Sequence, residues 1–341
     1  MITKSIIPFL LLFVAVIVFG KYMMWKRATV RALESESQLQ QTRLGPMEYK
    51  IYGEGEDVVV FLHGSPGGYD QYRPDGNVLS EGRRVLAISR PGYLRTPLST
   101  GQTPSQQADA VAALLDELDI GSVIIAGGSG GAPASLAFAA LHPHRTRALI
   151  VYAGISHSFT KSESGTGPRL FELASKTDFG GWLLLRPLAS KPEKLLAALV
   201  PDSANRERIL TNQLEKNLAR AVESTLPYSH RKAGVDNDWR QYEVLDLPLE
   251  RITAPTMIYH GTEDTNVPLV QSQYLHERVA GSALILLEGG DHFAQYSHKS
   301  EITAQTRAFL QDLFLRLLGL RRRTAAGVGG TLGKSRGGCH Q

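Results

Sequence analysis

Short continuous runs of apolar residues alternate along most of the chain with segments whose apolar residues recur at helical spacing. Runs bounded by Gly, Asp, Glu or Pro are typical of parallel strands that are buried on both faces. They predict strands over 47–52, 58–62, 84–89, 123–126, 149–152, 256–259 and 283–287. Helical spacing predicts helices over 105–118, 132–141, 267–279 and 301–318. The alternation predicts an α/β fold, in which a mostly parallel central sheet is covered by helices on both faces.

The pattern changes between residues 157 and 250, where no apolar strand-like run occurs. Helical spacing predicts helices there over 169–176, 182–188, 193–199, 205–225 and 239–245. Because the strand pattern then resumes, we interpret 157–250 as an insertion into a domain formed by 44–156 and 251–318. We expect the insertion to form a helical cap over the carboxyl edge of the sheet.

The N-terminus carries the longest apolar segment of the chain. Ile6 to Phe19 is almost wholly apolar, and Tyr22 to Trp25 extends it beyond Lys21. About 20 apolar residues are enough to cross a bilayer as a helix, so residues 1–27 predict a single-pass membrane anchor. A cleaved signal peptide is the alternative, although the run ends without a small-residue cleavage site.

Charges around this segment indicate its orientation. Lys4 is the only positive side chain before it, and four follow soon after: Lys21, Lys26, Arg27 and Arg31. The positive-inside rule therefore favours a folded domain on the cytoplasmic side of the membrane. Residues 28–43 are polar with helical spacing, and they predict a stalk between the anchor and the folded domain.

The composition gives no indication of a nucleic-acid-binding surface or of a site built from cysteines. Of the 341 residues, 43% are hydrophobic and 21% are charged, as in an ordinary globular protein. The net charge of +4 comes from basic residues near the two ends, and no basic stripe suggests a nucleic-acid partner. The one cysteine, Cys339, lies in a Gly-rich basic tail over 319–341 that we expect to be disordered. Neither a disulfide within the chain nor a cysteine-based metal site is therefore expected.

A glycine-rich turn follows the strand over 123–126. Gly127-x-Ser129-x-Gly131 fits the G-x-S-x-G pattern of a nucleophile elbow, where a strand turns sharply into a helix and exposes one serine. Glycines beside the turning residue let the strand and the helix approach closely. By itself the pattern also fits a flexible Gly/Ser loop, so the other strand ends decide between the two interpretations.

Other strands of the expected sheet end in groups that complement a serine nucleophile. Ligands of such sheets bind beyond the carboxyl ends of the strands. The residues that follow the strands are, in chain order, His63-Gly64-Ser65-Pro66-Gly67, then Ser129, then Asp264, then His292. A hydroxyl, an acid and an imidazole thus follow successive strands in the order Ser, Asp, His.

With this order of groups, the region from about Leu44 to Leu318 resembles the α/β-hydrolase fold family. The resemblance implies that Ser129 is the nucleophile, that His292 is the general base, and that Asp264 orients and stabilises the imidazole. No metal and no organic cofactor are implied.

The resemblance also implies an oxyanion hole built from the backbone N–H groups of Gly130 and Ser65. Ser65 occupies the variable position of the family's His-Gly-x-Pro loop. The preceding His63 is interpreted as a structural residue that holds this loop. Arg90, at another strand end, is interpreted as one partner of a structural ion pair.

Alternatives to the acid and the base stay open at this point. Asp264 competes with Glu263 and Asp291 for the role of the acid, and it could merely cap the following helix. His292 competes with His260 and His298 for the role of the base. His157 either faces the site or lies exposed on the insertion.

Two details narrow the expected activity. Serine at the elbow differs from the aspartate of dehalogenases and epoxide hydrolases. The His-Gly-Ser-Pro-Gly loop is similar to that of proline iminopeptidases, but those enzymes usually carry Trp where this chain has Gly130. That branch also needs acids in the cap to hold a free amine, and the insertion offers Glu163, Glu172 and Glu193.

The sequence thus favours a membrane-anchored serine hydrolase that acts on a small-molecule carboxylic ester. An aminopeptidase or amidase of the proline iminopeptidase type is one alternative, with a small-molecule amide as substrate. A non-catalytic, membrane-tethered binding protein with the same fold is the other.

Overall fold

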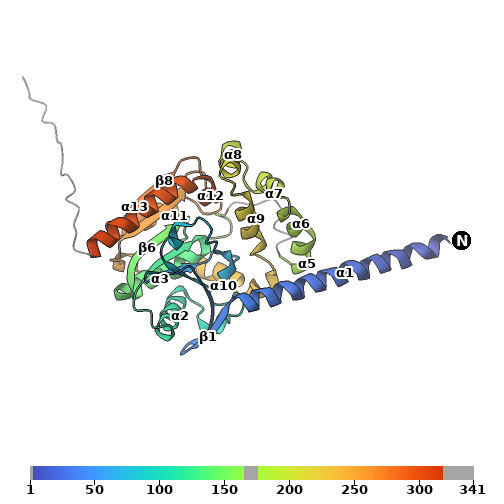
Figure 1. The fold of residues 1–341 in the computed structure, drawn as a ribbon, viewed down its shortest axis with the longest axis horizontal. Helices are drawn as coiled ribbons and strands as arrows, with labels where there is room; N and C mark the ends of the chain where they lie inside the picture. Colours follow the sequence, from blue (N-terminus) through green and yellow to red (C-terminus); the bar gives the residue numbers. More distant parts are fainter. Residues whose placement is uncertain (1–2, 165–175, 318–341) are drawn as a thin grey trace, which may run out of the picture.

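The computed structural model describes residues 3–164 and 176–317, and an eight-stranded sheet forms their centre (Figure 1). The strands lie in the order β1-β2-β4-β3-β5-β6-β7-β8. Their bounds are β1 (Gln38–Thr42), β2 (Gly45–Tyr52), β3 (Val58–Leu62), β4 (Arg84–Ile88), β5 (Val123–Gly128), β6 (Thr146–Tyr152), β7 (Thr256–Gly261) and β8 (Ala283–Leu287). β2 runs antiparallel to both β1 and β4, and every other pair is parallel. The mostly parallel sheet expected from the sequence is confirmed.

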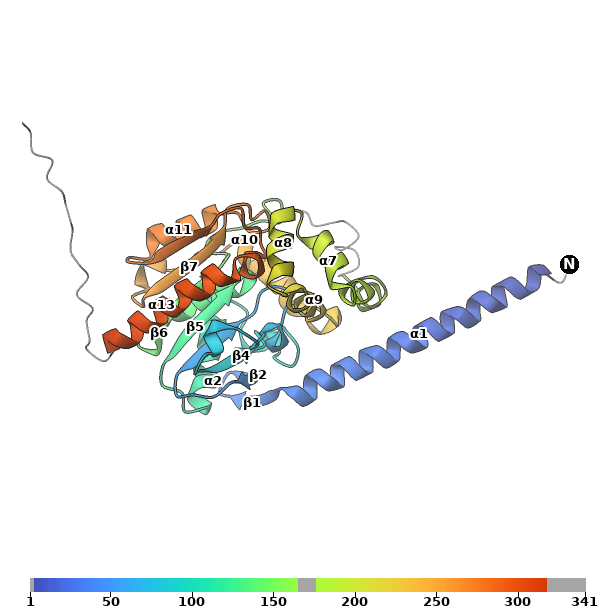
Figure 2. The ribbon, with the colours of Figure 1, turned by 45° about the horizontal axis from the view of Figure 1, so that its top comes forward.

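Helices cover both faces of this sheet because its central strands are apolar on both sides. In β3, Val58, Val60 and Leu62 belong to one hydrophobic core, whereas Val59 belongs to the other. The first core lies beneath α2 (Pro104–Glu117), α3 (Ala132–Leu141) and α11 (Val270–Arg278). On the other face, α13 (Lys299–Leu317) crosses the strands, and the short α12 (Ala294–Ser297) precedes it (Figure 2).

The segment between β6 and β7, called the helical insertion below, contains only helices and turns in its described part. Its α-helices and its π-helix are α5 (Asp178–Gly180), the π-helix η6 (Gly181–Leu185), α6 (Arg186–Ala189), α7 (Pro192–Leu199), α8 (Ser203–Thr211), α9 (Glu215–Glu223) and α10 (Lys232–Glu243), and the short 3-10 helices η7 (Tyr228–His230) and η8 (Leu249–Arg251) follow α9 and α10. The predicted single helix over 205–225 is wrong, because the helix is interrupted by a turn between α8 and α9. Gln213 has a φ of 55° there, which a continuous right-handed helix does not accommodate. The helix predicted over 169–176 lies outside the described residues, apart from Lys176.

The N-terminal helix α1 (Thr3–Glu36) is one continuous element that projects from the domain (Figure 1). Its part over Pro8–Glu36 is long and apolar enough to cross a membrane, with a mean hydropathy of 1.9 in its apolar window. The predicted stalk over 28–43 needs a correction at its end. Residues Gln38–Thr42 form the edge strand β1, paired with β2, so the sheet begins before Leu44. This strand is polar and largely exposed, so it lacks the apolar pattern that predicted the other strands.

Candidate active site

The turn after β5 holds Ser129 in a conformation that side chains rarely adopt. Its φ is 49°, in the left-handed region, which costs on the order of 1–3 kcal/mol for a residue with a Cβ. A Cβ on Gly127 would overlap the Ser135 hydroxyl, and one on Gly131 would overlap the carbonyl oxygen of Leu62. Strand, turn and helix α3 are therefore packed too closely for side chains at these two positions. This geometry fits the nucleophile elbow and not a flexible loop.

The structure joins the predicted acid to the predicted base. His292 Nδ1 lies 2.7 Å from Asp264 Oδ2. The other carboxylate oxygen of Asp264 accepts the backbone N–H groups of Asn266 (2.8 Å) and Val267 (3.0 Å). Asp264 thus contacts the imidazole with one oxygen and caps the following turn with the other, so capping does not prevent its contact with His292.

Electrostatics strengthen this pair. Burial lowers the pKa of His292, but the charge and the hydrogen bond of Asp264 outweigh burial, and the net pKa lies above its ordinary value. Burial raises the pKa of Asp264, but the His292 interaction and the backbone donors leave it lowered overall. The carboxylate is therefore ionised at neutral pH and holds the proton of His292 on Nδ1, which leaves Nε2 free to accept another.

The hydroxyl of Ser129 makes no hydrogen bond with His292 within the described residues. In unliganded enzymes this contact is often long and shortens only when substrate binds. The acid–imidazole pair is formed in the described structure, and Ser129 lies after β5 at the same carboxyl edge of the sheet, with β6 between β5 and β7.

The loop after β3 lies directly against the elbow. A Cβ on Gly64 would come 3.4 Å from the Cβ of Ser129, and one on Gly130 would come 3.2 Å from the backbone nitrogen of Ser65. The two residues predicted to supply oxyanion donors, Ser65 and Gly130, are thus neighbours beside Ser129.

His63 holds this loop and has no nitrogen left for catalysis. The backbone N–H of Arg90 donates to its Nε2 (3.0 Å), so Nδ1 carries the proton and faces the Gly64 carbonyl oxygen at 2.7 Å. Burial, followed by the charge of Arg90, lowers the pKa of His63 well below its ordinary value. The imidazole is therefore neutral and structural.

The competing histidines are also bound to other groups. His260 is fully buried between the Ser272 hydroxyl (2.7 Å) and the Val267 carbonyl (2.9 Å). His298 lies between Ser297, the Glu288 carbonyl and Arg208. His157 is half-buried, with its ring centroid 4.4 Å from that of Tyr274. None of these three contacts Asp264 as closely as His292 does.

Glu263 and Asp291, the other two candidates for the acid, lack the contact with His292 that Asp264 makes. Glu263 is exposed to solvent. One carboxylate oxygen of Asp291 accepts the backbone N–H of Phe293 at 2.8 Å, and the other is buried without a partner. Burial raises the pKa of Asp291. Neither acid forms a hydrogen bond with His292 in the described part of the chain.

The protein-family model for the α/β hydrolase fold matches residues 57–299 of the sequence, which include every candidate site residue. The chain belongs to the α/β-hydrolase fold family. As an α/β hydrolase it is 28% identical, over 81% of its length, to a 2-hydroxy-6-oxononadienedioate/2-hydroxy-6-oxononatrienedioate hydrolase of Pseudomonas putida. The alignment covers 97% of that relative.

Solved structures agree with the assignment of this chain to the α/β-hydrolase fold family. An α/β hydrolase fold protein from Nakamurella multipartita superimposes with a TM-score of 0.72 at 32% identity, over 81% of this chain and 98% of that one. An enol-lactonase from Burkholderia xenovorans LB400 superimposes with a TM-score of 0.61 at 20% identity, over 80% of this chain and all of the other. The second likeness concerns the fold alone.

A buried polar network supports the loop of this α/β hydrolase, and the sequence did not reveal it. Asp238, on α10, accepts two hydrogen bonds from the Arg90 guanidinium, at 2.9 and 2.6 Å. It also accepts one from the Tyr93 hydroxyl, which lies 2.8 Å from the Ser65 hydroxyl. The ion pair expected for Arg90 is therefore present. The network connects the helical insertion to the loop beside Ser129.

Tyr242, also on α10, explains why a glycine follows Ser129. Its hydroxyl donates to the carbonyl oxygen of Gly130 at 3.3 Å. A Cβ on Gly130 would overlap this hydroxyl, so a larger residue there requires Tyr242 to move. No local sequence signal pairs these two residues, because they are far apart along the chain.

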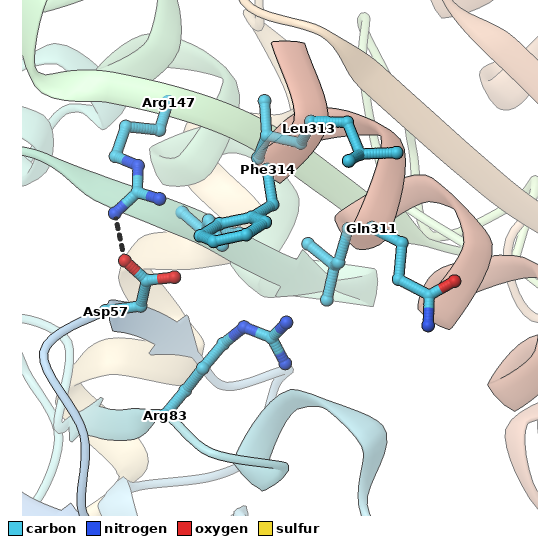
Figure 3. A pocket seen from close by; sticks show the side chains of 9 residues that line it. Asp57, Arg83, Arg147, Gln311, Leu313 and Phe314 are labelled. Carbon is cyan, nitrogen blue, oxygen red and sulfur yellow. Dashed lines mark hydrogen bonds and ion pairs between the residues drawn. The ribbon is translucent and has the colours of Figure 1, made fainter. Parts of the chain in front are cut away.

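One cavity of the described structure lies away from this site. It has a volume of about 350 Å³ and lies between α13 and the amino ends of the strands (Figure 3). Asp57 and Arg147 form an ion pair at its rim (2.6 Å), and Arg83 and Phe314 line it. The catalytic candidates lie at the opposite, carboxyl edge. Among the residues that the structure describes, no cluster of three His, Cys, Asp or Glu side chains is suited to hold a metal.

Proposed function

We propose that this α/β hydrolase is a serine hydrolase that acts through Ser129, His292 and Asp264. The observation that carries the proposal is the 2.7 Å contact between His292 and Asp264, together with the left-handed backbone of Ser129 in the turn after β5, at the same carboxyl edge of the sheet. Strained elbow serines and imidazole–carboxylate pairs are the two parts from which such triads are built.

The proposed reaction has two steps. Ser129 Oγ attacks the substrate carbonyl carbon while His292 Nε2 takes the hydroxyl proton, and the same proton then passes to the leaving alcohol. Water next attacks the acyl carbon while His292 takes a proton from it, and His292 then returns this proton to Ser129 Oγ as the bond to the acyl group breaks and the carboxylic acid departs. Asp264 stabilises the charged imidazole in both steps.

Backbone N–H groups of Ser65 and Gly130 are proposed to bind the oxyanion. Their adjacency beside Ser129 supports this assignment. A donor of this kind is worth about 2.7–4 kcal/mol of activation free energy when it is removed.

A neutral carboxylic ester is the substrate class we propose. The two fully buried arginines among the described residues, Arg90 and Arg231, are both neutralised, by Asp238 and Asp70 respectively. Neither is free to bind a carboxylate of the substrate, and an unpaired buried charge is costly. This charge balance favours an uncharged acyl group.

The second candidate substrate is a 2-hydroxy-6-oxo-dienedioate, because relatives named for such hydrolases align over most of the chain. A dianionic compound of this kind needs positive partners, which the two buried arginines do not offer. The aminopeptidase alternative is less well supported. Glu163 is hydrogen-bonded to Thr160, Glu193 is exposed, and Glu172 lies outside the described residues.

Helix α1 is proposed to be a retained membrane anchor. None of its apolar window is buried inside the protein, as expected for a helix that has lipid as its solvent. The charges that flank it favour a catalytic domain on the cytoplasmic side. We further propose that residues 157–250 act as a cap, since Asp238 and Tyr242 bring α10 to the site.

A panel of substrates tests the proposed activity. The full-length chain in detergent micelles is assayed with p-nitrophenyl esters of increasing acyl length, with a 2-hydroxy-6-oxo-dienedioate and with proline p-nitroanilide. We expect turnover of the esters and its loss in Ser129→Ala. Preferred turnover of the dienedioate or of the anilide contradicts the ester assignment, and the absence of all turnover supports the binding-protein alternative.

A further inference from the structure

The second half of α1 is docked on the helical insertion. The ring of Tyr22 contacts Phe179 at a centroid distance of 5.3 Å and Trp182 at 5.8 Å. Lys26 Nζ lies 2.6 Å from Asp178 Oδ2, and this carboxylate is almost fully buried. Aromatic contacts and an ion pair thus fix α5 and η6 beside one part of α1, and Figure 1 shows α5 next to this helix.

The position of a residue along α1 indicates how deep it lies relative to the membrane, and residues that pack beside it lie at a similar depth. Its residues from Phe9 to Phe19 are apolar and mostly exposed. Since a helix rises 1.5 Å per residue, Tyr22 lies roughly 5 Å beyond Phe19 along the axis. Tyr and Trp side chains concentrate at the boundary between lipid and water, so Tyr22 and Trp25 mark that boundary on the side of the folded domain.

Three apolar side chains of the insertion lie at the same depth and are exposed. Phe179, in contact with Tyr22, is 39% exposed, and Leu183 and Leu184 are 47% and 40% exposed. Both leucines directly follow Trp182 in η6, so they lie within about one helical turn, roughly 5 Å, of a residue that touches Tyr22. We call these three residues, Phe179, Leu183 and Leu184, the apolar edge.

We propose that the apolar edge inserts into the headgroup region of the lipid bilayer beside α1. The inference rests on the proposed membrane anchoring of α1. A bilayer is the occupant because the edge is continuous with the helix that enters the bilayer and lies at the level of its aromatic boundary residues. Three exposed basic side chains lie near these positions in the chain, Lys21 and Arg27 on either side of Tyr22 in α1 and Arg186 directly after η6, and basic residues of this kind favour contact with anionic lipid.

Insertion of this edge would give the enzyme a second contact with the membrane. The same helical insertion supplies Asp238 and Tyr242 to the candidate site, so that contact would hold the cap at the lipid surface. Esters that partition into the bilayer would then be concentrated near the enzyme. The inference therefore extends the proposed substrate class to apolar, membrane-dissolved esters.

Depth-dependent quenching of a fluorophore tests the proposal. The full-length chain with Cys339→Ser carries one new cysteine, Leu183→Cys, labelled with an environment-sensitive dye. It is reconstituted in vesicles of phosphatidylcholine and phosphatidylglycerol that contain lipids with a nitroxide near the headgroup end of one acyl chain. The matched control is Leu210→Cys, because Leu210 is 43% exposed and lies on α8, away from α1 (Figures 1 and 2). Phe13→Cys on α1 reports on the anchor itself.

We expect the dye at position 183 to be quenched several-fold more strongly than the dye at position 210. Position 13 is examined in a second set of vesicles, in which the nitroxide lies in the middle of the acyl chain. If the dyes at 183 and 210 are quenched equally while the dye at 13 is strongly quenched, the proposal is overturned and the anchor stays intact. If the dye at 13 is not quenched either, the anchor is wrong and the present inference falls with it.

A charge change tests whether docking of α1 positions the edge. Lys26→Asp places two carboxylates together at Asp178, so we expect it to reduce quenching at position 183 and to leave quenching at position 13 unchanged. Lys50→Asp is the control, because Lys50 forms an ion pair with Glu36 that does not involve the insertion. Unchanged quenching at 183 in Lys26→Asp contradicts the proposed geometry.

Discussion

Asp238, on the helical insertion, binds Arg90 of the core and Tyr93, which contacts the Ser65 loop. Its replacement by asparagine therefore tests the buried network. The side chains of Arg90 and Asp238 are 2% and 4% exposed. Asp238→Asn keeps the size of the side chain and removes its charge, so the Arg90 guanidinium stays buried without a counter-charge. Loss of one partner of a buried ion pair costs about 3–5 kcal/mol of folding free energy. With about 2 °C per kcal/mol for a chain of this size, the melting temperature should fall by roughly 6–10 °C.

The assay is thermal and denaturant unfolding of the full-length chain in detergent micelles, for the parent and the variant. Glu250→Gln is the matched control, because Glu250 and Arg278 form an ion pair that is exposed to solvent and therefore contributes little to stability. Tyr93→Phe separates stability from catalysis. It leaves the ion pair intact but releases the Ser65 hydroxyl, so we expect a lower kcat with a stability loss of only about 1 kcal/mol. If Asp238→Asn unfolds within about 1 kcal/mol of the parent, the energetic role given to this network is wrong.

Three further predictions concern the candidate triad and the elbow. Although burial lowers the pKa of His292, Asp264 raises it above its ordinary value of 6.5, so kcat/KM should fall as the pH drops through that raised pKa. Asp264→Asn should lower kcat by up to about 10⁴-fold and move this acid limb to lower pH, and an unmoved limb in a pH–rate profile contradicts the coupling. Ser129→Gly should be inactive yet more stable than Ser129→Ala by about 1 kcal/mol, because only glycine adopts a φ of 49° without strain. Equal unfolding midpoints of the two variants argue against strain at the elbow. Gly130→Ala should lower stability by about 1–3 kcal/mol through its clash with the Tyr242 hydroxyl, and adding Tyr242→Phe should restore part of the loss. Additive losses in the double variant rule out this clash as the cause.

Much of the α/β core could be predicted from the sequence because its strands are buried on both faces. A strand such as β3, with Val58 to Leu62, must be apolar at every position, and its end is marked by His63 and Gly64. Parallel strands bring their carboxyl ends to one edge, so the residues after them become neighbours whatever their separation along the chain. Because β7 and β8 are neighbours, the residues that follow them, Asp264 and His292, lie close enough to form their contact.

The remaining features depend on contacts that have no local pattern. β1 is a polar edge strand that pairs on one side only, so its apolar content does not distinguish it from a stalk. The break after α8 depends on a single left-handed residue, Gln213. The pair of Arg90 and Asp238 joins the core to the insertion, and only the packing of α10 against the core brings its members together.

The docking of α1 on the insertion escaped prediction for the same reason. Tyr22 and Trp25 fit a membrane boundary, and that interpretation of their sequence is compatible with their packing against Phe179 and Trp182. A hydrophobicity pattern records that a side chain avoids water. It does not record whether lipid or protein replaces the water.

Labelling with a fluorophosphonate tests the central claim most directly, because this probe forms a bond only with a serine activated by a neighbouring base. The full-length chain is treated with the probe, digested, and examined by peptide mass spectrometry. We expect a single adduct on the peptide that contains Ser129, and its loss in Ser129→Ala. No adduct on the parent protein, or an adduct that persists in Ser129→Ala, would contradict the assignment of Ser129 as the nucleophile.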